Sequence, residues 1–190
     1  MAPGVVLAMM DPPKHDDIRA LVGQGFFPRT LTLLEQEVRE LTNAILDKVQ
    51  NETEYDFLER VAAQLPLQVI CTMANIPRED WHRVMEWADA AITFAAHDAS
   101  VDTAPLIEKL TEMGMYAFGL IQQIRQQTPD ESVMSKVVHA EIPGVDGQPR
   151  KLDDLEIIRF FNLFMTGGTE TTRNAIAYGY YTLLKHPEQY

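Results

Sequence analysis

The stretch FMTGGTETTRN, from Phe164 to Asn174, places residues that could do chemistry inside an apolar run typical of a helix. Glycine in a helix interior costs about 1 kcal/mol relative to alanine, so Gly167 and Gly168 together cost roughly 2 kcal/mol. What they provide is bare helix surface, which something flat or small can approach. Glu170 and Thr171 then offer a carboxylate and a hydroxyl side by side, a pair that can bond water and supply protons. The stretch therefore suits a site for a small oxygen-containing ligand.

The same residues have a plainer interpretation. The two glycines could end one helix, with Thr169 capping the next, because threonine is a common N-cap residue. The residues alone leave both interpretations open. A phosphate-binding loop is disfavoured, since no Gly-Lys-Ser/Thr sequence follows the glycines.

A second candidate group lies near the N-terminus, in the stretch MDPPKHDDIRALVGQGFFPR from Met10 to Arg29. His15 and Arg19 are four residues apart and would share one face of a helix. Two hydrogen-bonding or cationic groups in that geometry can hold a pair of carboxylates. The alternative is a solvated surface pair, which is the more common role of such residues.

The elements that must position these groups are helices. Apolar residues recur at spacings of three and four from Leu31 to Val49, and again from Leu106 to Ile124. Between these two stretches, the sequence predicts a helix over Pro66–Ile76, with its proline at the first helical position. A further helix should follow over Glu79–Ile92, because its two leading acids suit the positive end of a helix.

Strand signals are sparse along the chain. The stretch Glu141–Leu152 is rich in glycine and proline and predicts a loop with a short hairpin around Asp146-Gly147. From Leu152 to His186 there is no proline, which predicts a single helix of roughly 50 Å that Pro187 ends. We therefore expect a mainly α chain that forms one domain over residues 1–190.

The composition excludes several classes of protein. Sixteen basic against 28 acidic residues give a formal charge of −12, which argues against a nucleic-acid surface and against attraction to an anionic membrane. The N-terminal GVVLAMM is too short to span a bilayer and lacks the basic lead of a signal peptide. Cys71 is the single cysteine, so neither a disulfide framework nor a multi-cysteine metal site is expected. A soluble, cytoplasmic protein is the expectation.

Taken together, four motifs resemble the cytochrome P450 family, in particular its bacterial-type soluble haem-thiolate monooxygenases. The stretch MDPPKHDDIRALV, with FFPR after it, is similar to the family segment D-P-P-x-H-x-x-x-R, which opens a helix against the haem. TGGTETTRN resembles the oxygen-activation motif (A/G)-G-x-(D/E)-T-T of a long central helix. DFLERVAAQLPLQVICTMANIP matches an intervening helix, and KHPEQ a helix-ending signature. The similarity runs in family order from Leu7 to Tyr190.

The resemblance implies that haem is the cofactor and that two pairs of residues contact it. His15 and Arg19 would bind the haem propionates through charge-assisted hydrogen bonds. Gly167 and Gly168 would form the groove over the distal haem face and leave room for dioxygen.

The resemblance also implies catalytic and substrate-binding roles on the same helix. Glu170 and Thr171 would be the acid–alcohol pair that guides protons during oxygen activation. Leu163 and Thr166, about one turn earlier, would face the substrate pocket.

The chain departs from the family pattern on the proximal side. The family's iron ligand is a cysteine thiolate in a loop expected beyond the equivalent of Tyr190, so no metal ligand is assigned in this chain. Cys71 matches a helical core position, where a free cysteine is most often a small buried hydrophobe. Glu156–Arg159 and Glu170–Arg173 fit the family's E-x-x-R pattern by chance, since that pair is also expected downstream. We therefore expect a partial domain, an internal fragment that is inactive alone.

The resemblance finally implies the partners of the complete protein. It would hydroxylate an apolar small molecule, with steroid- and alkyl-chain-oxidising members as the nearest in appearance, using O2 and electrons from a ferredoxin or flavoprotein. A stripe from Trp81 through Met85 and Trp87 to Phe94 could line a lipophilic channel, although ordinary packing explains such a stripe more often. The alternative function is a non-catalytic helical module that binds a hydrophobic ligand or a partner protein, with the glycines serving close helix packing.

Overall fold

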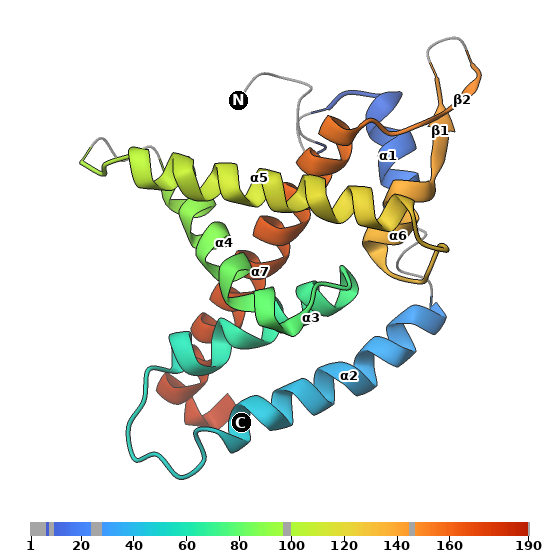
Figure 1. Cartoon of the computed structure of the whole chain (residues 1–190). Helices are drawn as coiled ribbons and strands as arrows, with labels where there is room; N and C mark the ends of the chain where they lie inside the picture. The colour runs from blue at the N-terminus through green and yellow to red at the C-terminus, as the bar shows by residue number, and fades with distance from the viewer. Residues whose placement is uncertain (1–6, 8–9, 24–27, 97–99, 145–146, 190) are drawn as a thin grey trace.

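A long helix, α7 (Asp154–Lys185), runs through the middle of the molecule, and several of the other helices pack against it (Figure 1). The computed structural model describes residues 7, 10–23, 28–96, 100–144 and 147–189, with the side chains of Val22 and residues 28–33 left out of the description. The elements, in chain order, are α1 (Lys14–Gly23), α2 (Pro28–Asp47), η3 (Leu58–Ala62), α3 (Gln64–Met73), η4 (Arg78–Asp80), α4 (Trp81–Ala95), α5 (Ala104–Arg125), α6 (Val133–His139), β1 (Glu141–Pro143), β2 (Pro149–Lys151), α7 and η5 (Pro187–Gln189). The predicted mainly α fold is confirmed.

A reciprocal cap fixes the first turn of α7. The Asp153 carboxylate accepts a hydrogen bond from the backbone N–H of Glu156 at 2.8 Å, and the Glu156 carboxylate accepts one from the N–H of Asp153 at 3.0 Å. This capping box satisfies two N–H groups that the start of a helix leaves without partners. The helix then continues unbroken to Lys185, so the single helix predicted between Leu152 and His186 is confirmed.

One side of α7 lies in the core. Ile157, Phe161, Met165 and Thr169 are buried and follow one another at spacings of four, which places them on one side of the helix. Helices α3, α4 and α5 pack against α7. From α5, the ring of Tyr116 lies 6.3 Å from that of Phe161, measured between centroids. The first half of α7, which leads into the candidate site, is therefore firmly held.

Three features of the helical framework differ from the prediction. Helix α3 begins at Gln64, so Pro66 lies within the first turn, where its missing N–H breaks no helical hydrogen bond. A π-helical turn, η3, precedes it and was not predicted. Helix α6 was also not predicted; Ser132 caps it by accepting a hydrogen bond from the N–H of Ser135. Both segments are too short to show a clear hydrophobic period.

The predicted hairpin is confirmed. Strands β1 and β2 pair antiparallel, with Glu141 opposite Lys151. Gly147 lies in the connection at φ 77°, a left-handed conformation that favours glycine, whereas Asp146 lies outside the described residues. Helix α1 packs against α6 and β1, so it lies at the same end of the molecule as the hairpin (Figure 1).

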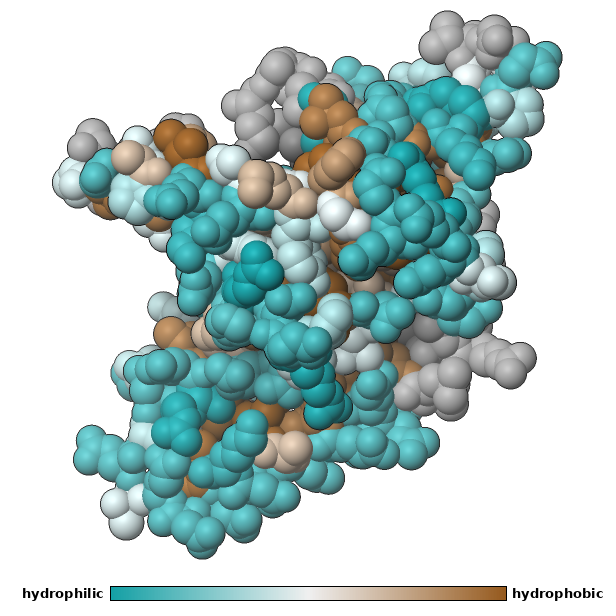
Figure 2. Space-filling view, in the orientation of Figure 1, coloured by the Kyte–Doolittle hydropathy of each residue, from teal (hydrophilic) through white to brown (hydrophobic). Residues whose placement is uncertain are grey.

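The second half of α7 is covered much less than the first. Its exposed large apolar side chains are Tyr178, Tyr180, Tyr181, Leu183 and Leu184. Figure 2 shows apolar patches among the polar side chains on the face that it draws. Within the part of the chain that the structure describes, no helix combines the length and apolar character needed to cross a membrane.

Candidate functional site

Gly167 and Gly168 face different sides of α7. A Cβ atom placed on Gly168 would lie 2.5 Å from Cδ1 of Ile70 and 3.0 Å from its Cγ1, whereas a Cβ on Gly167 would meet nothing within 4 Å. Gly168 therefore lets α3 approach α7 closely, and Gly167 leaves open helix surface. The expectation of bare surface is confirmed for Gly167 and wrong for Gly168. The contact of either glycine with a cofactor stays a prediction.

The glycines do not end a helix. Thr169, the residue proposed to cap a second helix, is buried and donates its hydroxyl to the carbonyl of Met165 at 2.9 Å, four residues back in the same helix. This is the bond that threonine makes inside a continuous helix. The interpretation of the glycines as a helix stop is therefore wrong.

The open side of α7 carries the acid–alcohol pair. Thr171 is exposed, and its hydroxyl donates to the carbonyl of Gly167 at 2.8 Å, which keeps the hydroxyl beside the bare glycine. Glu170 is half-buried, and its carboxylate forms no hydrogen bond or ion pair with any residue that the structure describes. A hydroxyl that has already used its proton can still accept a hydrogen bond, and an ionised carboxylate can accept several. The pair can therefore hold water and pass protons.

The predicted substrate-facing residues lie next to this pair. Leu163, Gly167 and Thr171 are spaced by four, and Leu163, Thr166 and Glu170 by three and four, so both sets share one broad side of α7. Leu163 and Thr166 are both half-buried. Thr166 donates its hydroxyl to the carbonyl of Asn162 at 2.8 Å. The structure thus places five of the predicted site residues along one side of α7: Leu163, Thr166, Gly167, Glu170 and Thr171.

His15 and Arg19 lie on α1, away from the acid–alcohol pair. The ring Nδ1 of His15 lies 2.8 Å from a carboxylate oxygen of Asp16, and Arg19 is exposed without an ion pair to any described residue. Helix α1 reaches the first turn of α7 through an ion pair between Lys14 and Glu156. Gly167 lies eleven residues further along α7, which corresponds to about 16 Å. A ligand that contacts both groups must therefore be large enough to reach from α1 to the middle of α7.

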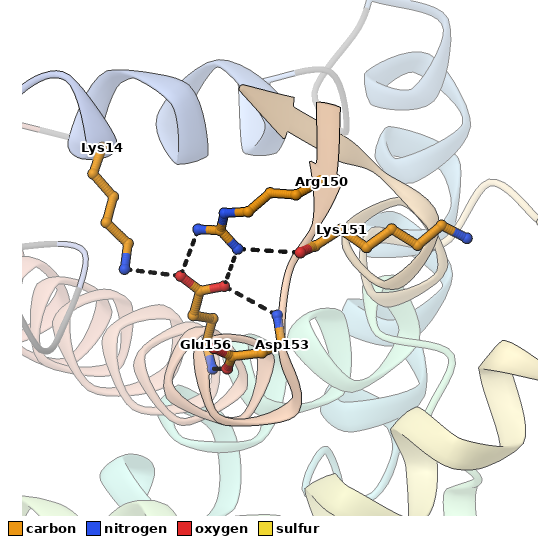
Figure 3. A network of polar contacts seen from close by, with 5 residues as sticks. All are labelled: Lys14, Arg150, Lys151, Asp153 and Glu156. Atoms are coloured by element: carbon orange, nitrogen blue, oxygen red, sulfur yellow. Dashed lines mark hydrogen bonds and ion pairs between the residues drawn. The ribbon is translucent and has the colours of Figure 1, made fainter. Parts of the chain in front are cut away.

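Among the carboxylates on α7, that of Glu156 makes the most hydrogen bonds and ion pairs with the described residues (Figure 3). It is 8% exposed, and its two oxygens accept bonds from the Arg150 guanidinium at 2.7 and 2.9 Å. The Lys14 ammonium lies 2.8 Å from one of these oxygens, and the N–H of Asp153 lies 3.0 Å from the other. The Arg150 guanidinium, with help from Lys14, lowers the pKa of the Glu156 carboxyl from 4.5 to about 2. This cluster joins α1, β2 and the start of α7.

The sequence contained part of the signal for this cluster. The spacing Asp153-x-x-Glu156 is that of a capping box and could have been recognised. The cationic partners could not, because Lys14 and Arg150 are brought in by the fold. The structure also separates the chance E-x-x-R pairs: Glu156 binds Arg150 in place of Arg159, and Arg173 binds Asp89 at 2.9 Å in place of Glu170.

Cys71 is buried at 0% exposure in α3, and burial raises the pKa of its thiol to about 12. A cysteine that binds a metal ion does so as a thiolate with access to the ion, whereas the Cys71 thiol is buried and has a raised pKa. The structure therefore agrees with the interpretation of Cys71 as a small buried hydrophobe. Among the described residues there is also no cluster of histidine, cysteine and carboxylate side chains that could hold a metal ion.

The lipophilic-channel interpretation does not hold for Trp87. This side chain is fully buried, and its indole N–H donates to the Glu112 carboxylate at 3.2 Å. Trp81 likewise donates to the carbonyl of Ile76 at 3.0 Å. A cavity of about 500 Å³ lies between the end of α3 and α5, next to Asp80, and none of its lining residues is a predicted site residue. Packing therefore explains the tryptophans of this stripe.

Comparison with known proteins agrees with the arrangement described above. The chain matches the family model described as Cytochrome P450 over residues 3–190. It is 34% identical to the putative cytochrome P450 126 of Mycobacterium tuberculosis, over 98% of this chain and 44% of that protein. It is 31% identical to the methyl-branched lipid omega-hydroxylase of Mycobacterium bovis, over 96% of this chain and 42% of that protein.

Two further similarities point the same way. The chain is 31% identical to the steroid C26-monooxygenase of Rhodococcus jostii, over 97% of this chain and 37% of that protein. The structure of Mycobacterium marinum cytochrome P450 CYP268A2 in complex with pseudoionone matches with a TM-score of 0.85 at 31% identity, over 99% of this chain and 45% of that chain. The chain belongs to the cytochrome P450 family, whose members use haem iron as cofactor. It spans less than half the length of these relatives.

Proposed function

We propose that the protein containing this chain is a haem-dependent monooxygenase that hydroxylates an apolar substrate, using O2 and electrons from a ferredoxin or flavoprotein. The observation that supports this most is the open side of α7. It combines bare backbone at Gly167, a hydroxyl at Thr171 and, at Glu170, a carboxylate that bonds to no described residue. Helix packing alone accounts for Gly168, but it does not account for these three residues.

The residues of this chain fit haem on its propionate and distal sides. Arg19 has no ion-pair partner among the described residues, so its guanidinium is available to a propionate, and His15 lies one turn before it. The open surface at Gly167 accommodates a flat group against α7. Cys71 does not fit an iron ligand, and no iron ligand is assigned in this chain. When bound, haem would supply the oxygen chemistry.

The role proposed for Thr171 and Glu170 is to hold and move protons. Because the Thr171 hydroxyl donates to the Gly167 carbonyl, its lone pairs can accept a hydrogen bond from a water on the open side. Glu170, the adjacent residue, would bring protons to that water. General acid–base groups positioned in this way contribute about 10²- to 10⁴-fold to a reaction.

The substrate class proposed is a lipid-like molecule with an alkyl or steroid framework. Leu163 presents an aliphatic side chain, and Thr166 has its hydroxyl proton bonded to the carbonyl of Asn162. Neither residue therefore demands a polar partner from the substrate. Two of the relatives are named for the oxidation of a methyl-branched lipid and of a steroid, which supports the same class.

The test is the substitution Thr171→Ala in the protein expressed from its complete reading frame. Loss of the hydroxyl should leave electron consumption in place and lower the product formed per electron pair by about 10²-fold or more. Thr172→Ala is the matched control, because Thr172 is also exposed and lies one residue further along. If product formation stays coupled in T171A, Thr171 has no role in proton delivery.

A further inference from the structure

Helix α5 lies on the outside of the molecule, where it crosses in front of α4 and α7 (Figure 1). Met113 and Ile121 on its inner side are fully buried. On its outer side, Ile107, Met115 and Phe118 are 50%, 67% and 47% exposed. A single exposed apolar side chain is ordinary, whereas three along one side of one helix make a surface that a partner can cover.

The middle of this outer side is uncharged. Thr111 and Gln122 share it with Met115 and Phe118, at spacings of three and four. Glu112, the one charged residue in this stretch, faces α4 instead, where it accepts the indole N–H of a tryptophan. A solvated helix face is normally rich in charge, whereas the centre of a protein interface is depleted of charge and enriched in aromatic residues and methionine. The outer side of α5 therefore has the composition of an interface.

Opposite charges mark the two ends of the outer side. Glu108, near the start of α5, is exposed and forms no hydrogen bond or ion pair with any residue that the structure describes. Arg125, the last residue of α5, is exposed and pairs with Asp154. A guanidinium has five N–H donors, so Arg125 can bind a second carboxylate at the same time. A helix face with an acid at one end and a base at the other is complementary to itself when one copy is turned end for end.

We propose that the outer side of α5 binds the same side of α5 in a second copy of this chain, with the two helices antiparallel about a two-fold axis. The axis passes between Tyr116 and Ala117, because this point lies midway between the acid and the base at the two ends. In the resulting register, the following residues of the two copies face one another: Met115 and the partner's Phe118, Thr111 and the partner's Gln122, and Glu108 and the partner's Arg125.

The matched pairs are chemically complementary. A methionine sulfur makes favourable contacts with an aromatic ring, so Met115 suits the partner's Phe118. The Thr111 hydroxyl donates to the carbonyl of Ile107, so its lone pairs can accept a hydrogen bond from the amide of the partner's Gln122. Because the axis is two-fold, each pair occurs twice in the dimer. The ion pairs at the two ends fix the register more than they add affinity.

A single helix face makes a small interface. Helix α5 has 22 residues and is about 33 Å long. Leu155, at the start of α7, is 53% exposed and lies beside Asp154, which binds both Gln122 and Arg125, so it can extend the contact. Interfaces of this size belong to weak or transient pairs, so we expect a dissociation constant in the micromolar range.

The test measures self-association of the protein expressed from its complete reading frame, by sedimentation equilibrium from about 1 to 100 μM. The wild type should show a reversible equilibrium between monomer and dimer. Met115→Glu sets an acid against the partner's Phe118 twice in each dimer, and it should raise the dissociation constant by about 100-fold. Met115 is 67% exposed in the monomer, so this variant should fold as the wild type does.

Charge reversal tests the antiparallel register. Glu108→Arg sets two arginines against each other at both ends of the dimer, and Arg125→Glu sets two glutamates there, so each variant alone should associate about 10-fold more weakly. A mixture of the two variants restores both ion pairs and should form a heterodimer with the affinity of the wild type, which also shows that both variants are folded. Glu54→Arg, in the exposed connection between α2 and η3, is the matched control and should leave the dissociation constant unchanged.

Three results would overturn the proposal. The first is a wild type that stays monomeric, or an M115E variant that associates as the wild type does. The second is a mixture of E108R and R125E that associates no better than either variant alone. The third is a wild type that does not associate together with a loss of thermal stability in M115E, because this result would mean that the rest of the protein covers α5 in place of a second copy.

Discussion

Glu156 and Glu170 are two carboxylates on one helix with opposite surroundings. Glu156 is 8% exposed and accepts hydrogen bonds or ion pairs from Arg150, Lys14 and the N–H of Asp153 (Figure 3). Glu170 is half-buried and bonded to none of the described residues. Buried polar groups in folded proteins are normally satisfied, so a satisfied carboxylate indicates a structural role. Glu170 reaches solvent and bonds to no described residue, so its carboxylate is available to water or to a ligand.

The two glycines show the same division at the level of the backbone. The space beside Gly168 is filled by the Ile70 side chain, so Gly168 allows the close contact between α3 and α7. Gly167 meets nothing and leaves the helix bare. Substitutions in the satisfied set should therefore change stability, whereas substitutions in the unsatisfied set should change ligand binding or coupling.

The largest expected effect is that of Glu156→Ala. Removing the carboxylate leaves Arg150 and Lys14 without their partner and opens the capping box, which should cost about 3–5 kcal/mol of unfolding free energy. Glu170→Ala, the matched variant, should stay within about 0.5 kcal/mol of the wild type. Urea unfolding of both variants measures the difference. Equal losses of unfolding free energy in the two variants would contradict the different roles assigned to Glu156 and Glu170.

The next effect is an acid-dependent loss of stability. The pKa of Glu156 is about 2 in the folded chain against 4.5 without its partners, so its contribution is fully present above pH 4.5 and is lost as the pH falls toward 2. At about 1.4 kcal/mol per pKa unit, this amounts to about 3 kcal/mol. Glu156→Gln should remove this part of the acid dependence. If E156Q loses as much stability at low pH as the wild type, other groups cause the acid-dependent loss.

A smaller effect is expected at the glycines. Gly168→Val should force α3 and α7 apart and cost about 1–3 kcal/mol, because its side chain has to occupy the space of Ile70. Gly167→Ala should instead raise helix stability by up to about 1 kcal/mol and weaken haem retention. Thermal unfolding and the rate of haem transfer to an acceptor protein measure the two effects. Adding Ile70→Val should recover part of the loss in G168V, and no recovery would mean that the contact is not the cause.

The predictable parts of this molecule are the local ones. The long helix, the hairpin and the side of α7 with Leu163, Gly167 and Thr171 follow from periodicity, proline positions and spacing. The role of Gly168 could not be predicted, because it depends on Ile70, which lies far away in the sequence. The same reason applies to Arg173, whose partner is Asp89 on α4 and not the nearby Glu170.

The central claim is that this chain supplies the propionate-binding and distal parts of a haem site. The most direct measurement is the haem content of the protein expressed from its complete reading frame, together with the spectrum of its reduced carbon monoxide complex. We expect one haem per chain, with the spectrum of thiolate ligation, and loss of haem retention in a His15→Ala, Arg19→Ala double variant. A folded protein that takes up no haem would contradict the account and would favour a non-catalytic helical module.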